Sequence, residues 1–232
     1  MKKDLPFVFS NFAMTADGKI AFGGGKFTPF GGKLDLEHLY ELRATADAVM
    51  CGARTVETTG TILGNGGEKF RKLRLKHGLA EFPLRVLVSG SGSVNPAAKI
   101  FKKRFSPIVV LTTARIPTAN LKQLLDVADE VKICGKSQIN FPAALRWLLE
   151  KWNVKRLLCE GGGELHHALI SAGLVDELNL TICPKIFGGQ NAPTIADGSG
   201  FSRLADAAQF KLKSINRVDD ELFAVFSQRK TA

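Results

Sequence analysis

The feature that most constrains this chain is a regular alternation of short apolar runs with helical segments between residues 85 and 183. Apolar runs that predict strands occupy residues 85–88, 107–111, 130–134, 156–159 and 175–183, and segments that predict helices occupy 121–127, 141–152 and 165–172. In the longest helical segment, Leu145, Leu148, Leu149 and Trp152 recur at helical spacing. Strands that alternate with helices predict a mostly parallel sheet covered on both faces.

The two ends of the chain extend this pattern. Further strands are predicted at residues 5–13, 47–52, 210–214 and 222–226. Asp35 is interpreted as the N-cap of a helix that runs to Arg43, and the last two strands form an antiparallel hairpin around Asp219-Asp220. The predicted fold class is therefore α/β, with a mostly parallel central sheet flanked by helices and an antiparallel C-terminal hairpin. No linker or repeat interrupts the 232 residues, so residues 1–232 are interpreted as one domain.

Two glycine-rich stretches predict loops. Gly23-Gly24-Gly25 and Gly31-Gly32 bracket the first loop, because glycine adopts backbone angles that other residues avoid. Residues 60–83 are first glycine-rich and then basic. They predict an insertion or a loop with some helix at 69–76.

The net charge of +10 allows three classes of interaction. The 32 basic residues outnumber the 22 acidic ones, and the excess gathers at 69–76 and 99–104. Such clusters bind nucleic acid, bind small anions, or simply form a solvated surface. Aromatic residues do not alternate with these basic residues, as they do in binders of single-stranded nucleic acid. We therefore expect no nucleic-acid partner.

The cysteines and the hydropathy indicate a cytoplasmic protein. None of Cys51, Cys134, Cys159 and Cys183 belongs to a Cys-x-x-Cys pair, which is typical of reduced core thiols. The four histidines lack metal-ligand spacing, so no metal is expected. No run of 18 apolar residues is present and the first apolar stretch is short, so neither a membrane span nor a signal peptide is expected.

The sharpest local motif is Glu160-Gly161-Gly162-Gly163-Glu164-Leu165, which follows a predicted strand and opens a predicted helix. Glycines let the backbone approach a ligand, and the N–H groups of a helix N-terminus suit a pyrophosphate. The alternative interpretation is a tight strand-to-helix connection without a ligand. A carboxylate disfavours phosphate, so Glu160 is expected to face a hydrogen-bond donor such as the amino edge of a pyrimidine.

Two further segments combine a strand end with turn residues. Residues 13–20 read Ala-Met-Thr-Ala-Asp-Gly-Lys-Ile, and residues 52–56 read Gly-Ala-Arg-Thr-Val. Taken alone, the first is as consistent with a hairpin turn as with a binding loop. Together with the glycine motif, and in this order, the segments are specific.

In combination they resemble the reductase domain of riboflavin biosynthesis, a family related in fold to dihydrofolate reductase. The resemblance spans about residues 7–226, and it also rests on Leu42-Arg43-Ala44, Gly173-Leu174-Val175-Asp176-Glu177, Pro184-Lys185-Ile186-Phe187-Gly188-Gly189, Ala192-Pro193-Thr194 and Asp197-Gly198-x-Gly200-Phe201. The last group is most similar to the stand-alone archaeal-type enzymes. The zinc deaminase domain to which bacterial members are often fused has no counterpart in this sequence.

The resemblance implies NADPH as cofactor and a ribosylamino-pyrimidine 5′-phosphate as substrate, whose ring-opened sugar carbon receives the hydride. Implied cofactor contacts are Ala13, Gly52, Thr55, Ser89, Ser91, Gly161, Gly162, Gly163, Glu164 and Leu165. Implied substrate contacts are Asn11, Arg43 and Glu160. It further implies a cis peptide bond between Gly161 and Gly162. It also implies a homodimer, because the hydrophobic strand 222–226 would be exposed in a monomer. The hydroxyl-rich turn at Ser89–Ser91 can hydrogen-bond a 2′-phosphate. This turn and the excess of basic residues favour NADPH over NADH.

The sequence departs from the family pattern after Val56. An Asp-Asp-Pro run and a phosphate-binding Arg usually follow, whereas this chain continues with Glu57 and a Thr- and Gly-rich stretch. Arg71 or Arg74 is a candidate for the missing phosphate contact, and Phe27 and Pro29 occupy positions of polar or Trp ligands. An NADPH reductase of another heterocycle, such as a pterin or dihydrofolate, therefore stays open as an alternative. A nucleic-acid-binding protein, suggested by the net charge of +10, is the second alternative.

Overall fold

The computed structural model describes residues 4–23 and 28–229. The chain forms two compact units. Unit 1 contains the described residues up to Phe7 together with residues 40–158, and unit 2 contains residues 8–39 and 159 onward. Gly24, Gly25 and Phe27 of the first predicted loop lie outside the described residues.

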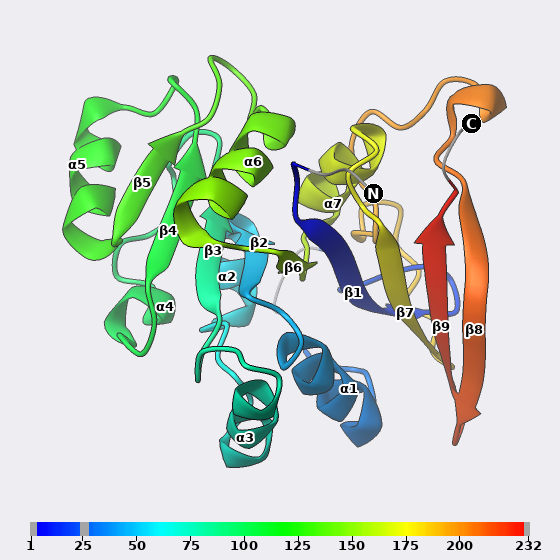
Figure 1. The fold of residues 1–232 in the computed structure, drawn as a ribbon. Helices are drawn as coiled ribbons and strands as arrows, with labels where there is room; N and C mark the ends of the chain where they lie inside the picture. The colour runs from blue at the N-terminus through cyan, green and yellow to red at the C-terminus, as the bar shows by residue number, and fades with distance from the viewer. Residues whose placement is uncertain (1–3, 24–27, 230–232) are drawn as a thin grey trace. The chain divides into compact units, whose positions relative to one another are not determined.

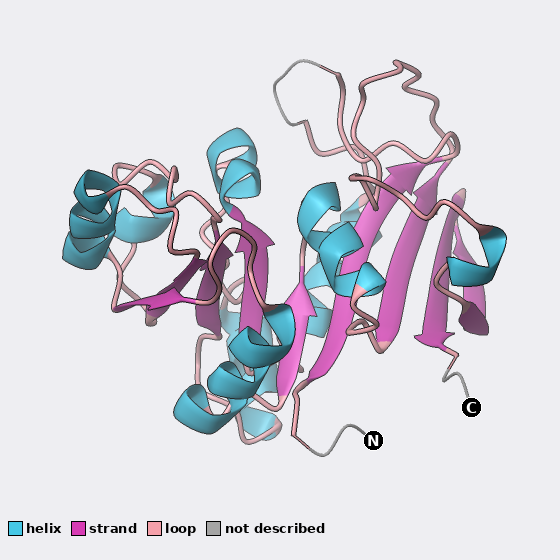
Figure 2. Ribbon diagram, turned by 90° about the horizontal axis from the view of Figure 1, so that it is seen from above, coloured by secondary structure: helices cyan, strands magenta, loops and turns pink. Residues whose placement is uncertain are grey.

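Unit 1 is an alternation of strands and helices (Figure 1). Its strands are β2 (Ala48–Gly52), β3 (Leu84–Val88), β4 (Ile108–Thr112), β5 (Glu130–Ile133) and β6 (Arg156–Cys159), in the order β5-β4-β3-β2-β6. β2 to β5 pair in parallel with their sequential neighbours. The connecting helices, cyan in Figure 2, are α2 (Ala53–Thr59), α3 (Glu68–Lys76), α4 (Lys99–Lys102), α5 (Thr118–Val127) and α6 (Phe141–Trp152). Every residue of β4 is buried, as expected for a strand between two covered faces.

Helix α6 shows why the sequence predicted this unit well. Asn140 caps its N-terminus by accepting a hydrogen bond from the Ala143 N–H at 3.1 Å. Asn153 ends it in the left-handed conformation, with φ of 53°. Leu145 and Leu148 face the core. Caps and periodicity therefore agree, and the helix has the predicted bounds.

Unit 2 carries the remaining strands, β1 (Phe7–Thr15), β7 (Glu177–Cys183), β8 (Phe210–Val218) and β9 (Glu221–Gln228), in the order β1-β7-β9-β8. β1 and β7 are parallel, whereas β9 runs antiparallel to both β7 and β8. Helix α7 (Gly163–Ser171), the first turns of α1 (Lys33–Arg43) and the 3-10 turn η1 (Leu204–Asp206) complete the unit. The mostly parallel sheet with an antiparallel C-terminal hairpin confirms the predicted fold class.

The two faces of the β1–β7 pair differ in chemistry. Phe12, Leu178 and Leu180 form an apolar cluster on one face. Asn179 and Thr181 alternate with these leucines and therefore lie on the opposite face. Register pairs Asn11 with Asn179 and Ala13 with Thr181, so all four side chains share this second face, which we call the polar face.

The structure corrects three sequence predictions. Helix α1 begins at Lys33, so Asp35 lies in its first turn and is not its N-cap. Helices α2 and α4 and the turn η1 were missed because each is short. Strand β9, which contains the hydrophobic residues 222–226, lies between β7 and β8, so it is not an edge strand.

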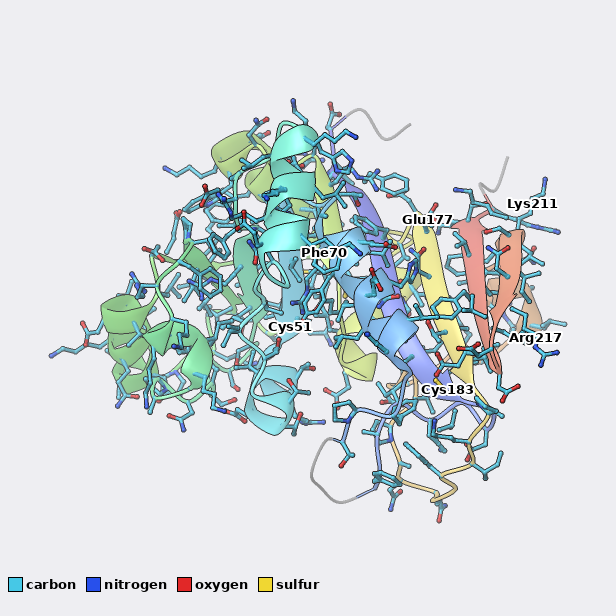
Figure 3. All side chains as sticks on the ribbon, turned by 90° about the horizontal axis from the view of Figure 1, so that it is seen from below. Cys51, Phe70, Glu177, Cys183, Lys211 and Arg217 are labelled. Carbon is cyan, nitrogen blue, oxygen red and sulfur yellow. The ribbon has the colours of Figure 1, made fainter. Side chains whose placement is uncertain are left out.

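The edge strand of unit 2 is β8, and it is largely exposed. Lys211 and Arg217, near the two ends of β8, point away from the sheet in Figure 3. Charged residues on an edge strand oppose uncontrolled pairing with other strands. In the part of the chain that the structure describes, no helix is both long enough and apolar enough to cross a membrane.

Candidate functional site

The glycine motif of unit 2 joins β6 to α7 as predicted. Gly161 has φ of 97°, and the peptide bond between Gly161 and Gly162 is cis, which confirms the expectation. A Cβ atom on Gly161 would lie 3.0 Å from Phe12 Cε1, so the loop passes close to β1. Gly162 provides no side-chain cap for α7. The first N–H groups of α7 are therefore not capped by Gly162.

Gly163 has a packing role that the sequence did not reveal. A Cβ atom at this position would collide with Asp197 Oδ2 and the Thr194 carbonyl oxygen. The Asp197 N–H donates to the Gly163 carbonyl at 3.1 Å, and Asp197 Oδ1 accepts from the Thr194 hydroxyl at 2.7 Å. The turn at 194–197 thus packs directly on the start of α7.

Asp17 links two segments of the family-like pattern. Its carboxylate accepts hydrogen bonds from Thr15 Oγ1 at 2.5 Å and from the Phe187 and Gly188 N–H groups at 3.2 and 2.7 Å. The Thr15 hydrogen bond has the largest effect, and together these bonds lower the pKa of Asp17 to about 2. The Asp-Gly turn at residues 17–18 is therefore held against the loop that contains Phe187.

His166 on α7 was missed at the sequence level because a lone histidine in a helix carries no pattern. It is fully buried, with Nδ1 2.7 Å from the Ile195 carbonyl oxygen and Nε2 3.0 Å from Ser10 Oγ. Burial is the main cause that lowers the pKa of His166 to about 4, so the ring is neutral. Because a carbonyl can only accept, Nδ1 carries the proton and Nε2 accepts from the Ser10 hydroxyl.

The predicted residues Asn11 and Ala13 lie two positions apart on the polar face of unit 2. Asn179 Nδ2 donates to the Ser10 carbonyl at 3.2 Å and to Glu177 Oε1 at 3.4 Å. Asn11 Oδ1 is buried and has no hydrogen-bond partner among the described residues. The sequence thus identified a residue that places a buried acceptor on the polar face.

Asp35 also faces the polar face, although the sequence suggested only a capping role. Burial raises the pKa of its carboxyl, the Thr181 hydroxyl opposes this effect, and the charge of Glu221 adds to it. The Asp35 carboxyl and the buried Thr181 hydroxyl therefore lie against one another.

In unit 1, the predicted cofactor residues gather where neighbouring parallel strands end. Gly52 ends β2 and is paired with Val88, the last residue of β3. Thr55 lies in α2, directly after Gly52, and Ser89 and Ser91 follow β3. In sheets of this kind, ligands bind at the carboxyl ends of the strands.

The turn after β3 is internally braced. Ser89 Oγ accepts from the Ser93 N–H at 3.1 Å, and the Gly90 carbonyl accepts from the Thr113 hydroxyl at 2.6 Å. Ser91 is exposed. These hydrogen bonds hold the turn while the Ser91 side chain stays at the surface of unit 1.

Arg43 is the last residue of α1 and belongs to unit 1. Its Nη1 donates to the Gly64 carbonyl at 2.8 Å, and its guanidinium lies 5.4 Å from the centre of the Tyr40 ring. The side chain is 6% exposed. A structural role of Arg43 therefore accompanies the substrate contact that the sequence implied.

A family comparison decides among the interpretations left open by the sequence. The model of the RibD C-terminal domain matches residues 6–224. The chain belongs to the RibD C-terminal domain family.

Near full-length relatives agree with this assignment. The chain is 31% identical over 225 residues to the 2,5-diamino-6-ribosylamino-4(3H)-pyrimidinone 5′-phosphate reductase of Methanothermobacter thermautotrophicus, covering 96% of this chain and 98% of that protein. It is 34% identical over 220 residues to the protein of the same name from Archaeoglobus fulgidus, covering 95% and 96%. The chain thus groups with the pyrimidine reductases of riboflavin biosynthesis.

Solved structures show the same fold. A pyrimidine reductase-like protein from Corynebacterium diphtheriae superposes with a TM-score of 0.83 at 23% identity, covering 97% of this chain and 93% of that one. The deaminase/reductase of Thermotoga maritima has a TM-score of 0.72 at 22% identity, and the chain covers 58% of it.

The basic residues Arg71 and Arg74 of α3 contact groups of the protein itself. Arg74 is 1% exposed and donates to the carbonyl oxygens of Arg43, Ala46 and Ala80 at 2.5, 2.8 and 2.8 Å. Arg71 pairs with Glu68 at 2.7 Å and with Glu81 at 2.6 Å. The guanidinium of Arg74 is therefore enclosed by backbone carbonyl groups and does not reach a substrate phosphate, whereas the role predicted for Arg71 stays a prediction.

Glu57, which follows Val56 in α2, also contacts the protein. Its Oε1 accepts from the Asn95 N–H at 3.0 Å and so holds the segment that follows the Ser89–Ser91 turn. In the part of the chain that the structure describes, no group of histidine, cysteine and acidic residues could hold a metal ion.

Proposed function

We propose that this protein is an NADPH-dependent reductase that converts the ribosyl group of 2,5-diamino-6-ribosylamino-4(3H)-pyrimidinone 5′-phosphate to a ribityl group. The observation that supports it most strongly is the similarity to two archaeal proteins of that name along 96% and 95% of the chain. The intact glycine motif at the start of α7 supports the same proposal.

The glycine motif suits a dinucleotide. Gly161 lacks the Cβ that would crowd Phe12, and α7 is nine residues long with no side-chain cap at Gly162. The helix dipole favours a pyrophosphate at this end. In unit 2 we assign Ala13, Gly161 to Gly163, Glu164 and Leu165 to cofactor binding, and in unit 1 Gly52, Thr55, Ser89 and Ser91.

Bound NADPH would supply the hydride, and the residues of the chain would bind and orient the substrate. In unit 2, the free acceptor Asn11 Oδ1 and the carboxylate of Glu160 suit the amino groups of a diaminopyrimidine. In unit 1, Arg43 is the proposed substrate contact. Such positioning can supply a large part of a rate enhancement.

The basic charge supports small-molecule binding better than nucleic-acid binding. Helix α3 carries much of the excess, but Arg74 is buried and Arg71 and Lys72 are paired with Glu68. These three basic residues of α3 thus interact with groups of the protein itself.

The test is NADPH oxidation with the diaminopyrimidine phosphate and, in a separate assay, with dihydrofolate. The proposal expects oxidation with the pyrimidine only and a product that has gained two hydrogen atoms. Oxidation with dihydrofolate only would assign the protein to another heterocycle. Oxidation with neither would overturn the proposal.

A further inference from the structure

The positive charge of the chain is concentrated in unit 1. Residues 40–158, which make up most of this unit, hold 20 of the 32 lysines and arginines but only nine of the 22 aspartates and glutamates. The rest of the chain holds 12 basic and 13 acidic residues, so its charges nearly cancel. Such an excess attracts anionic ligands, and the loops of unit 1 differ in how far carboxylates neutralise it.

The loops at the amino ends of the unit 1 strands carry both signs of charge. The loops before β2 to β6 contain three acidic residues, Asp47, Glu81 and Asp129, and three lysines or arginines, Lys103, Arg104 and Lys155. Arg104 Nη2 lies 3.0 Å from Asp129 Oδ1. Asp47 Oδ2 accepts from the Lys155 N–H at 2.9 Å. Carboxylates beside the cations weaken the attraction for a phosphate at this end of the strands.

The loops at the carboxyl ends of β3, β4 and β5 contain no acidic residue. They comprise residues 89–98, 113–117 and 134–140, and their charged residues are Arg115 and Lys136. Both side chains are exposed, and within the described residues neither pairs with a carboxylate. Glu57 contacts the first of these loops from α2, where its Oε1 accepts from the Asn95 N–H at 3.0 Å. The loops also contain four serines, so hydroxyl donors accompany the cations, as suits a phosphate.

Hydrogen bonds hold these three loops together. Thr113 Oγ1 donates to the Gly90 carbonyl at 2.6 Å, which ties the loop after β4 to the loop after β3. The Ala114 N–H donates to the Gly135 carbonyl at 2.9 Å, which ties the loop after β4 to the loop after β5. The two residues that follow Ala114 and Gly135 along the chain are the two exposed cations. The cations therefore stand on adjacent loops that are braced against the hydroxyl-rich turn.

These loops continue the region of unit 1 that the proposed function assigns to the cofactor. The assigned residues of unit 1 follow β2 and β3, and β4 and β5 are the next strands in the sheet (Figure 1). In sheets of this kind, ligands bind at the carboxyl ends of the strands. A cofactor at the ends of β2 and β3 therefore has the loops after β4 and β5 beside it. NADPH differs from NADH only by a phosphate group on the 2′ oxygen of its adenosine.

Arginine and lysine bind a phosphate in different ways. A guanidinium donates two parallel hydrogen bonds, and an ammonium group supplies a compact charge. We propose that Arg115 and Lys136 bind the 2′-phosphate of NADPH, with the exposed Ser91 hydroxyl as a further donor, and that they determine the preference for NADPH over NADH. This inference rests on NADPH as the cofactor of the proposed function and adds the two cations that select it.

The experiment measures binding of two small probes to the full chain by calorimetry. Adenosine 2′,5′-bisphosphate and adenosine 5′-monophosphate differ only in the 2′-phosphate, so the ratio of their Kd values isolates this group. Wild type should bind the bisphosphate more tightly. Hydrogen bonds to charged groups change affinity by about 10-fold or more, so Lys136→Gln and Arg115→Gln should each raise the Kd of the bisphosphate about 10-fold. The Kd of the monophosphate should stay at the wild-type value.

Two control variants separate a phosphate contact from the general charge of unit 1. Lys151→Gln removes an exposed lysine from the last turn of α6 and should leave both Kd values unchanged. Lys136→Arg keeps the charge and should retain most of the preference for the bisphosphate. Because the side chains of Arg115 and Lys136 are exposed, Tm should be the same in all variants. An equal effect of Lys151→Gln would assign the preference to net charge and overturn the inference.

The failure of this inference and that of the proposed function give different results. A wild-type ratio of the two Kd values in Lys136→Gln or in Arg115→Gln would overturn the role of that residue, even if wild type reduces the pyrimidine with NADPH. Equal Kd values of wild type for the two probes would overturn the whole inference. If wild type prefers the bisphosphate as expected but reduces the pyrimidine with neither NADPH nor NADH, the proposed function fails and the phosphate site stands.

Discussion

The Ser10 hydroxyl on β1 donates a hydrogen bond of 3.0 Å to Nε2 of His166 on α7. The His166 ring also packs on Phe12, with centroids 4.5 Å apart, and Phe12 in turn lies beside Gly161. One buried imidazole therefore joins the strand that carries Asn11 and Ala13 to the helix that begins at the glycine motif. Within unit 2, the placement of the proposed ligand-binding residues depends on His166 being neutral.

This dependence predicts an acid-sensitive fold. Because the pKa of His166 is about 4 in the folded protein and about 6.5 when unfolded, the unfolded chain binds the extra proton between these values. Stability should then fall as pH drops, by about 2 kcal/mol between about pH 7.5 and pH 5. Urea unfolding of wild type and His166→Gln should show that this share of the fall is absent in the variant. An equal pH dependence of the two proteins would contradict the assignment.

Gly163→Ala tests the packing at the start of α7. The new Cβ would collide with Asp197 and the Thr194 carbonyl, so we expect a loss of about 1–3 kcal/mol in the free energy of unfolding. Gly23→Ala is the matched control, because its Cβ would find only ordinary contacts of 3.8 Å or more. Equal stability of the two variants would show that the turn at 194–197 can move away from α7.

Regular elements were predictable because local signals agree with the tertiary structure. Residues 141–152 and 156–159 have the predicted bounds, since caps and spacing mark the ends of the helix and a run of apolar residues marks the strand. Helix α2 was missed because its residues Ala53–Thr59 bury only Ala53 and Val56, which is too short a pattern to recognise.

The site was predictable only where a sequence motif marks it. Glycines and strand ends revealed Gly161 and Gly52, whereas His166 and Thr181 acquire their environment from residues far away in the sequence. Arg74 shows the opposite error. Its charge suggested a phosphate contact, but three backbone carbonyls that no pattern predicts surround it.

Arg74→Met should therefore act on folding and not on phosphate binding. The change leaves the buried carbonyls of Arg43, Ala46 and Ala80 without a donor, and we expect a loss of about 2–4 kcal/mol. Arg71→Ala removes exposed ion pairs and should cost less than about 1 kcal/mol. Chemical unfolding gives both values, and KM for the phosphorylated substrate should be unchanged in Arg71→Ala. A large rise in that KM would restore Arg71 as a phosphate contact.

The preference for NADPH over NADH should depend on Arg115, which is exposed just after β4. The backbone N–H of Arg115 donates to Thr113 Oγ1 at 3.2 Å, and the Thr113 hydroxyl donates to the Gly90 carbonyl. These two hydrogen bonds connect the backbone at Arg115 to the Ser89–Ser91 turn. Arg115→Ala should raise the Kd for NADPH about 10-fold and leave that for NADH unchanged, because only NADPH carries a 2′-phosphate. Lys122→Ala on α5 is the control. Equal NADPH and NADH affinities in the wild-type protein would refute the preference itself.

The last prediction is a homodimer that uses β8. Leu212 and Ile215 are 48% and 51% exposed, and their register opposite Phe226 and Ala224 places them on the apolar face of the unit 2 sheet. An exposed apolar edge of this kind is typical of an interface between copies, and closed symmetric dimers are the commonest assemblies. Light scattering should give twice the 25.1 kDa of the chain at micromolar concentration, and Leu212→Glu should give the monomer. Leu204→Glu changes a residue on η1 that is 90% exposed and should leave the dimer intact. A monomeric wild-type protein would refute the dimer, and a dimeric Leu212→Glu would place the interface elsewhere.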